Sequence, residues 1–521
     1  MSYDPEQRLL LPPDLREWLP EGHLALFESD VVDQLDLSPI LEHYERGDGR
    51  GRPPYHPLMM VKLLVYGYSI GVKSSRKIEK ASYEDIAFRV LACNQHPDHD
   101  SIAEFRKTHL EELAKLFVQV LQMCERAGLV KLGQVAIDGS KLRANASKHK
   151  AMSYERMCAK EEQLAAEVER LLAEAAATDE AEDQQYGKGQ RGDELPMELA
   201  RRESRLRRIR EAKAALEAEA KEKAKATAAA AEAKLEVRKQ REVETGKKPR
   251  GRPPQVPDIA AAKPDPKAQR NFTDPESRIM KDSATGSFEQ CYNAQVAVDS
   301  EAQIIVAASL TQEVNDKRQL VPLLLAVKAN LGQLPEKAMA DAGYFSASAV
   351  TDAALSSVDL YVTPDRGKKT EAEGELGETT AAEDQPVIEA MRAKLKTAAG
   401  REVYRQRKLI VEPVIGQVKE GRGFRRFSFR GRRKNQAEWV LICLTHNLLK
   451  LFRQQAGPVS GTKVNKEKTA LSLAQSTGLS FAPTVAAFFQ VLIAWIRDRV
   501  EIDLELPVSV QCHLLVSSPT A

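Results

Sequence analysis

Three acidic residues far apart along the chain stand in contexts that suit metal-assisted chemistry. Asp138 ends the short apolar run 135–137 and is followed by Gly139, which predicts a buried strand that delivers a carboxylate to the rim of a sheet. Asp341 follows the short run 337–340, and Glu412 lies in a predicted helix over 402–419. Burying a carboxylate is costly unless it is paired or holds a metal. A single acid at a strand end is also typical of a turn or a helix cap, so the interpretation depends on all three together.

The order of the predicted elements places these acids on one fold. The sequence predicts a succession of strands and helices that begins at 134–138 and continues through strands at 292–298 and 304–307, a helix at 316–330, a strand at 337–340, a helix at 346–355, a strand at 359–362 and the final helix at 402–419. This succession matches an α/β, ribonuclease-H-like domain, in which acids lie on the first strand, after the fourth and on the last helix. Asp138, Asp341 and Glu412 fall at those three places.

Several short motifs surround the three acids. They are Gly51-Arg-Pro-Pro-Tyr-His-Pro57, Asp138-Gly-Ser-Lys141, Ala340-Asp-Ala-Gly-Tyr344, and the set Tyr404, Arg407, Glu412 and Lys419. With these motifs the chain resembles the DDE transposases of bacterial insertion sequences, from about residue 5 to residue 455. The last set is similar to that family's Tyr-Arg-Glu-Lys signature, but four residues separate Arg407 from Glu412 where the usual pattern has three.

The resemblance implies a metal cofactor and roles for the acids. In-line cleavage of a phosphodiester requires charge neutralisation on the attacking and the leaving oxygen, which two divalent ions about 4 Å apart can supply. Mg²⁺ prefers oxygen ligands. We therefore expect two Mg²⁺ ions, for which Mn²⁺ can substitute, held by the catalytic residues Asp138, Asp341 and Glu412, with Asp138 bridging both. Lys419 lies about two turns beyond Glu412, so the two side chains should project from one face of the helix.

A basic segment follows the third acid. Residues 401–434 hold twelve Lys or Arg residues against three Glu, and cations beside a phosphoryl-transfer site bind the DNA backbone. The side chains expected to contact DNA are Tyr404, Arg407, Lys419, Arg422, Arg425 and Arg426. Three phenylalanines, at 424, 427 and 429, alternate with these cations. They could stack on unpaired bases, but packing beneath the loop is the favoured interpretation.

The chain is expected to contain four regions. Residues 1–130 are a helical amino-terminal domain, interpreted as DNA-binding, and its basic residues Lys73, Arg76, Lys77, Arg106 and Lys107 are compatible with a helix-turn-helix-like reader. An ordinary helical bundle is the alternative. Residues 131–150 and 255–455 form the catalytic domain, and 151–254 an inserted helical hairpin with a basic linker. Residues 456–521 form a tail of unknown role, with a predicted helix over 484–499 and a strand over 508–515.

The insertion is rich in Ala, Glu, Lys and Arg. Apolar residues from Tyr154 to Ala175 recur in steps of three and four, and a second helix is predicted over 197–243. Such an antiparallel hairpin could be a solvated arm, or it could pair with a second copy or with DNA. The tetrapeptide Arg-Gly-Arg-Pro occurs at 50–53 and again in the linker at 247–254; it can enter a narrow minor groove, or it can be only a basic linker.

The whole chain excludes some classes of protein. Its 521 residues carry a formal net charge of only +2, so a nucleic-acid partner must be recognised by local patches. The six cysteines include no Cys-x-x-Cys pair, which argues against a disulfide framework or structural zinc site. We find no signal peptide and no apolar stretch of about 18 residues. A cytoplasmic protein without membrane contact is expected.

These features predict a transposase that binds the terminal repeats of an insertion sequence. It would hydrolyse phosphodiesters there and transfer strands to target DNA. Because both ends of the element must meet, a homodimer or larger assembly on double-stranded DNA is expected. Two alternatives stay open: a non-catalytic DNA-binding derivative of such an enzyme, and a nuclease on the same fold.

Overall fold

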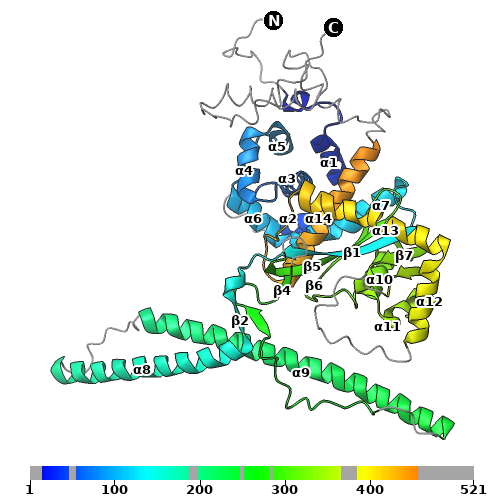
Figure 1. The fold of residues 1–521 in the computed structure, drawn as a ribbon. Helices are drawn as coiled ribbons and strands as arrows, with labels where there is room; N and C mark the ends of the chain where they lie inside the picture. The colour runs from blue at the N-terminus through cyan, green and yellow to red at the C-terminus, as the bar shows by residue number, and fades with distance from the viewer. Residues whose placement is uncertain are drawn as a thin grey trace, which may run out of the picture. The chain divides into compact units, whose positions relative to one another are not determined.

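The computed structural model describes residues 14–45, 54–186, 197–246, 252–281, 286–364 and 384–455 (Figure 1). Three of the expectations above lie outside these ranges in whole or in part. They are the Arg-Gly-Arg-Pro segment at 50–53, the first two residues of its second copy at 250–253, and the helix and strand expected within 456–521. Among the helices that the structure describes, none combines the length and the apolar character needed to cross a lipid bilayer.

A mixed six-stranded sheet forms the centre of the fold. Its strands are β1 (Gln134–Arg143), β4 (Arg278–Lys281), β5 (Phe288–Asp299), β6 (Ile305–Thr311), β7 (Lys337–Ala340) and β8 (Asp359–Val362). The strand order is β4-β5-β1-β7-β8, and β6 also pairs with β5. The pairs β1–β5 and β5–β6 are antiparallel, whereas β7 and β8 run parallel to β1. This arrangement is the ribonuclease-H-like sheet expected from the sequence.

Helices cover the sheet and connect its parallel strands. α10 (Leu320–Leu331) and α11 (Ala347–Val350) lie in the connections that lead into β7 and β8, and α13 (Ala398–Gly416) packs against β1. α13 continues into a π-helical turn, Gln417–Gly421, before the long α14 (Arg432–Gln455) packs on β6. A further helix, α12 (Gln385–Lys396), was not expected from the sequence.

The amino-terminal region consists of short helices. They are α1 (Leu24–Asp33), α2 (Ser38–Glu45), α3 (Pro57–Ser69), α4 (Ser75–Glu84), α5 (Ile86–Leu91), α6 (His99–Thr108) and α7 (Leu110–Arg126), preceded by a 3₁₀ turn, Leu15–Trp18. The sequence predicts one long helix from about Asp100 to Ala127, but this helix is interrupted at His109, which caps α6 and precedes α7. Helices α3 and α7 pack on α14, so these helices and the sheet share one continuous hydrophobic core.

Polar and aromatic contacts join this region to α14 and to the segment that precedes it. The buried Tyr68 hydroxyl lies 3.1 Å from Glu438 Oε1 of α14, and its ring stacks on Phe424 at 5.6 Å between centroids. Arg106, which is 7% exposed, donates to the Tyr68 hydroxyl and to the Lys73 carbonyl. Phe424 and Phe427 are buried as well, so they pack beneath the basic segment as the favoured interpretation held. Arg106 therefore binds groups in the interior of the protein, whereas the partly exposed Lys73 donates to the Arg426 carbonyl.

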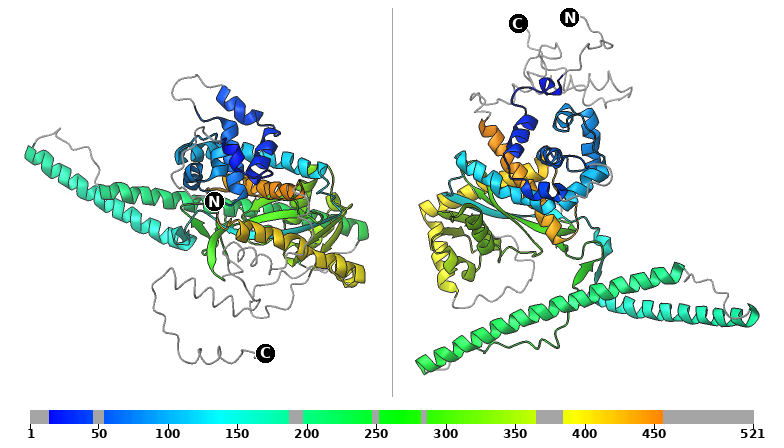
Figure 2. Two further views of the ribbon diagram at one scale, coloured as in Figure 1. Left: turned by 90° about the horizontal axis from the view of Figure 1, so that it is seen from above. Right: turned by 180° about the vertical axis from the view of Figure 1, so that it is seen from behind.

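The insertion forms two helices on a small sheet of its own. β2 (Ala151–Ser153) pairs with β3 (Gln269–Asn271), and α8 (Tyr154–Tyr186) runs beside the first part of the much longer α9 (Met197–Thr245) (Figure 2). A second hydrophobic cluster joins the two helices, with Met157 and Leu164 of α8 against Leu206, Ile209 and Leu216 of α9. The expected seam on α8 is therefore confirmed for Tyr154, Met157, Leu164 and Val168, whereas β2, β3 and β4 were not predicted.

Glu28 on α1 provides a test of this shared core. The residue is 1% exposed, and burial raises its pKa to about 8 although Ser69 and Arg422 lower it in part. Between pH 4.5 and about 8 the folded state holds a proton that the unfolded state releases, so stability should fall as the pH rises through this window and level off above it.

Glu28→Gln should reduce that fall by up to about 1.4 kcal/mol per pH unit. Urea unfolding across the window measures it. The exposed Glu21→Gln is the control; equal pH dependence in wild type and Glu28→Gln would contradict the assignment.

Candidate active site

The pairing of β1 with β7 sets two aspartates side by side. The strands are parallel, with Gln134 opposite Lys337 and Ala136 opposite Met339. The same register continued by two residues brings Asp138 level with Asp341, which follows the last residue of β7. Adjacent parallel strands lie about 4.8 Å apart, so two like charges meet at one edge of the sheet.

Asp138 has a largely buried carboxylate with a cationic partner. Its Oδ1 accepts from the Gly139 amide at 2.8 Å, and its Oδ2 lies 3.3 Å from Nη1 of Arg407 on α13. Burial raises the pKa of Asp138 to about 6; Arg407 and the Gly139 amide lower it, whereas the charges of Asp341 and Asp316 raise it. The pKa of this carboxyl therefore reflects a dry site that holds more negative charge than Arg407 balances.

Asp316 is a third carboxylate at the same place. Its Oδ1 accepts from Asn293 Nδ2 at 2.7 Å and from Gln295 Nε2 at 2.6 Å, both on β5. The Tyr344 hydroxyl donates to Gln295 Oε1, and the Gln295 carbonyl accepts from Trp439 Nε1 at 3.1 Å. Burial raises the pKa of Asp316, the two amides lower it, and the charge of Asp341 raises it. A chain of buried hydrogen bonds thus fixes this acid beside the aspartate pair.

Sequence reasoning treated Asp316 as an ordinary acid. Its position before α10 gives no signal, because an acid at that point is typical of a helix entry. A usable signal lay in β5, where Asn293 and Gln295 are polar residues two apart in the otherwise apolar stretch 291–298. Residues two apart face the same side of a strand, and buried amides require hydrogen-bond partners.

Glu412 does not join these carboxylates in the structure. The residue is exposed, whereas Arg407, Val411 and Val414 on the same helix are buried. Helical residues four apart share a face, but five residues turn the chain by about 500°, which leaves Glu412 about 140° from Arg407. The additional residue between Arg407 and Glu412 therefore explains the exposure, because Val411 holds the inward position that the usual spacing gives to the glutamate.

Tyr404 and Lys419 lie near the aspartates. Burial raises the pKa of the Tyr404 phenol, and the charges of Arg407, Asp341 and Asp138 also act on it, which places its side chain beside the site. Lys419, in the π-helical turn, is 3.1 Å from Ser140 Oγ and 3.4 Å from the Lys141 carbonyl on β1. Its ammonium group therefore lies beside Ser140, two residues beyond Asp138 on β1.

The remaining three expected DNA contacts have different surroundings. Arg422 turns inward, where it donates to Thr445 Oγ1 at 2.8 Å and to the Ile442 carbonyl at 3.2 Å. Arg425 and Arg426 are exposed. The Arg425 side chain pairs with Glu420, and the Arg426 carbonyl accepts from Lys73. Of the three, Arg422 thus binds residues of α14 in the interior, and the side chains of Arg425 and Arg426 lie at the surface.

The donor set suits a hard divalent cation. Asp138, Asp341 and Asp316 supply only oxygen, which is what Mg²⁺ prefers. Among the described residues, however, no group of three or more His, Cys, Asp or Glu side chains is arranged to hold a metal ion as it stands. Arg407 supplies the positive charge next to Asp138 in this arrangement. A cation at the pair would share or replace that contact.

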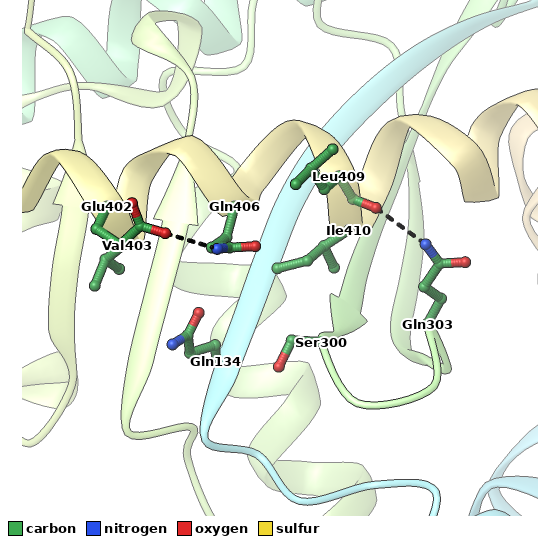
Figure 3. Close-up of a pocket in the computed structure, with 8 residues that line it drawn as sticks. All are labelled: Gln134, Ser300, Gln303, Glu402, Val403, Gln406, Leu409 and Ile410. Carbon is green, nitrogen blue, oxygen red and sulfur yellow. Dashed lines mark hydrogen bonds between the residues drawn. The ribbon is translucent and has the colours of Figure 1, made fainter.

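A hollow of about 370 Å³ lies elsewhere along α13, between this helix and the first residue of β1 (Figure 3). It is lined by Gln134, Ser300, Gln303, Glu402, Val403, Gln406, Leu409 and Ile410. Its polar groups bond to one another, as in the Glu402–Gln406 pair and the contact of Gln303 with the Leu409 carbonyl. The hollow contains none of the three aspartates, so it is not the candidate active site.

Comparisons with known proteins match two segments of the chain. Residues 13–108 match the family model described as Transposase domain (DUF772), and residues 260–448 match the one described as Transposase DDE domain. Together the two segments cover more than half of the chain. Neither includes Asp138 or the helical insertion. No curated protein matches, and no solved structure matches.

A substitution at Gly139 tests how closely the side chains of the site are packed around this residue. A Cβ at this position would lie 2.5 Å from Gln295 Nε2 and 3.1 Å from Asp316 Oδ1, so Gly139→Ala should displace the amide that holds Asp316. We expect a loss of about 1–3 kcal/mol, as is usual for overpacking, measured by urea unfolding. Gly133→Ala is the matched control, because nothing lies within 4 Å of its Cβ position. Equal stability of the two variants would contradict this description.

Proposed function

Because the chain belongs to the DDE transposases of insertion sequences, which transfer phosphoryl groups on DNA, we propose that it binds the terminal repeats of its element, hydrolyses phosphodiesters there and joins the 3′-hydroxyl ends to target DNA. The observation that carries this proposal is the register that places Asp138 beside Asp341 at the edge of the sheet. Carboxylates in that position can hold the cations that such chemistry requires.

The residues around the pair have distinct proposed roles. Asp138 and Asp341 would hold the metal, for which we propose Mg²⁺ with Mn²⁺ as a substitute. Bound there, divalent ions would neutralise charge on the phosphate and lower the pKa of the attacking hydroxyl. Lys419, fixed beside β1, would hold a phosphate oxygen next to the reacting one. Arg407 retains a buried Nε without a hydrogen-bond partner among the described residues, which leaves a donor for a second phosphate oxygen.

We propose Glu412 as the third acid. Because its side chain is exposed, it must rotate toward Asp138 and Asp341 before it can act. The π-helical turn at Gln417–Gly421 accommodates one extra residue relative to an α-helix, and it follows Glu412. Pro413 also removes a backbone hydrogen bond within α13. If the π turn moved to the amino-terminal side of Glu412, this side chain would rotate toward the position that Val411 now holds. We propose that DNA binding favours this shift.

The proposed partner is double-stranded DNA, both the element ends and the target. A homodimer or larger assembly would hold the two ends together, since strand transfer of both ends needs two active sites. Exposed cations at Arg425 and Arg426 lie next to β1 through the backbone contacts of Arg143, which supports a DNA path across this strand.

Asp138→Asn and Asp341→Asn should each abolish strand cleavage. Loss of a metal ligand should reduce the cleavage rate by at least about 100-fold, the upper end of the effect of mutating residues that only support such ligands. The assay follows cleavage and joining of a duplex that carries the element's terminal repeat, with Mg²⁺ or Mn²⁺. The exposed Asp100→Asn is the control. Failure of the wild type to cut would favour the non-catalytic derivative, and cutting without joining or end preference would favour a nuclease.

Glu412→Gln and Asp316→Asn distinguish two versions of the site. If the helix shift occurs, Glu412→Gln should lose cleavage about as severely as Asp138→Asn, at least about 100-fold. The same assay with Asp316→Asn measures the contribution of the acid that already lies beside the pair. Near-normal cleavage by Glu412→Gln together with loss in Asp316→Asn would reject Glu412 as the third acid.

A further inference from the structure

The base of the helical insertion contains a basic pocket that the proposed chemistry does not use. Its volume is about 870 Å³, and it lies where α8, α9 and the β2–β3 pair meet. Five cationic side chains line it, and no acidic residue does; the five are Lys150, Arg156, Arg201, Arg205 and Arg208. Such a concentration of one charge indicates an anionic partner.

The cations of α9 divide into two groups. On one face Arg202 pairs with Glu167 at 3.3 Å, and Arg210 and Lys213 pair with Glu161 at 3.0 and 2.9 Å. These ion pairs join α9 to α8. Arg201, Arg205 and Arg208 lie at the spacing i, i+4 and i+7, which places them on one other face. Within the part of the chain that the structure describes, the five pocket cations have no ion pair and no side-chain hydrogen bond.

The apolar surroundings of the pocket strengthen the positive electrostatic potential in it. Met152, Ile209 and Phe272 form an apolar floor beneath exposed arginines, and low-dielectric walls focus the field of neighbouring charges. Like charges one turn apart on a helix repel each other, so the stripe is unfavourable for the isolated chain. A bound anion would remove this repulsion.

The pocket is also close along the chain to the catalytic strand. Lys150 follows the end of β1 by seven residues, and β3 leads directly toward β4 at the edge of the main sheet. Between Asp138 and the pocket, β1 carries Lys141 and Arg143, and Arg143 lies beside Arg426. Positive charge therefore continues from the carboxylates to the base of the hairpin.

We propose that this pocket binds the phosphate backbone of double-stranded DNA that extends from the catalytic site. The choice of DNA as the anion rests on the proposed function. Regular spacing of arginines along a helix suits a repeating array of phosphates better than a single small anion. The proposed contact is confined to the first part of α9, at the base of the hairpin. The hairpin is then a DNA-holding arm rather than a solvated one.

The test removes three charges from the pocket and, separately, three from elsewhere on α9. The first variant is Arg201→Gln/Arg205→Gln/Arg208→Gln. The control is Arg207→Gln/Lys221→Gln/Lys223→Gln, which lies on the same helix outside the pocket. Both are made in the full chain with Asp138→Asn, so that cleavage does not interfere. Fluorescence anisotropy measures binding of a labelled duplex over a range of salt concentrations, and circular dichroism verifies the helix content.

The pocket variant should bind the duplex at least about tenfold more weakly, and the slope of log K against log salt should fall by about 2–3, since each lost phosphate contact removes about 0.9. Arg205→Gln alone should reduce the slope by about 1. The control should bind like the parent. Unchanged affinity and slope in the pocket variant would overturn the proposal, as would an equal loss in the control or a change only in self-association. If the unmodified chain fails to cleave DNA while the binding results hold, the proposed function fails and the pocket assignment stands.

Discussion

The parallel pairing of β1 with β7 is the constraint on which the candidate active site depends. It places two aspartates at one level of the sheet, where burial and the neighbouring charge of Asp341 disfavour the charged form of Asp138. The fold answers this cost with specific contacts: the Arg407 guanidinium on Asp138, the Gly343 amide on Asp341, and two amides on Asp316. Replacing buried charges by apolar residues is often neutral or stabilising, so structural need alone does not account for these acids, in agreement with the role proposed for them.

Helix phase is the second determinant of the site. α13 must present side chains to β1 along one face, and a single additional residue changes which side chains these are. The buried Val411 and the exposed Glu412 illustrate the effect. The π-helical turn beyond them restores the inward direction for Lys419, which reaches Ser140. The additional residue before Glu412 rotates the following side chains on the helix, and the π-helical turn after Glu412 reverses this rotation. Because the turn comes after Glu412, the glutamate stays exposed.

Much of the sheet could be predicted from the sequence because its strands are short apolar runs bounded by turn residues. The run before Asp341 gave the correct strand, whereas the strand expected to end at Asp138 continues to Arg143. The succession of elements indicated the ribonuclease-H-like fold. Local patterns could not predict β2, β3 and β4, because these strands are short and partly polar and form only through distant partners. The break at His109 was also missed, since the helical periodicity continues through it.

The site was predictable only in part for related reasons. Composition identified the basic segment 401–434, but it could not tell which cations face the core, and Arg422 turned out to bind Thr445. Asp316 was missed because its role depends on amides of another strand. The exposure of Glu412 follows from the spacing to Arg407, a departure visible in the sequence whose consequence is clear only once Arg407 is seen to face Asp138.

The continuous core has a consequence for how this protein handles a long, flexible polymer. The amino-terminal helices are not tethered to the sheet by a linker; they are fused to it through Tyr68, Phe424 and Glu438. Any surface on those helices is therefore kept at a constant distance and angle from the two aspartates. If these helices contact DNA, their position relative to the aspartates is set by the folded core and does not depend on the motion of a flexible linker.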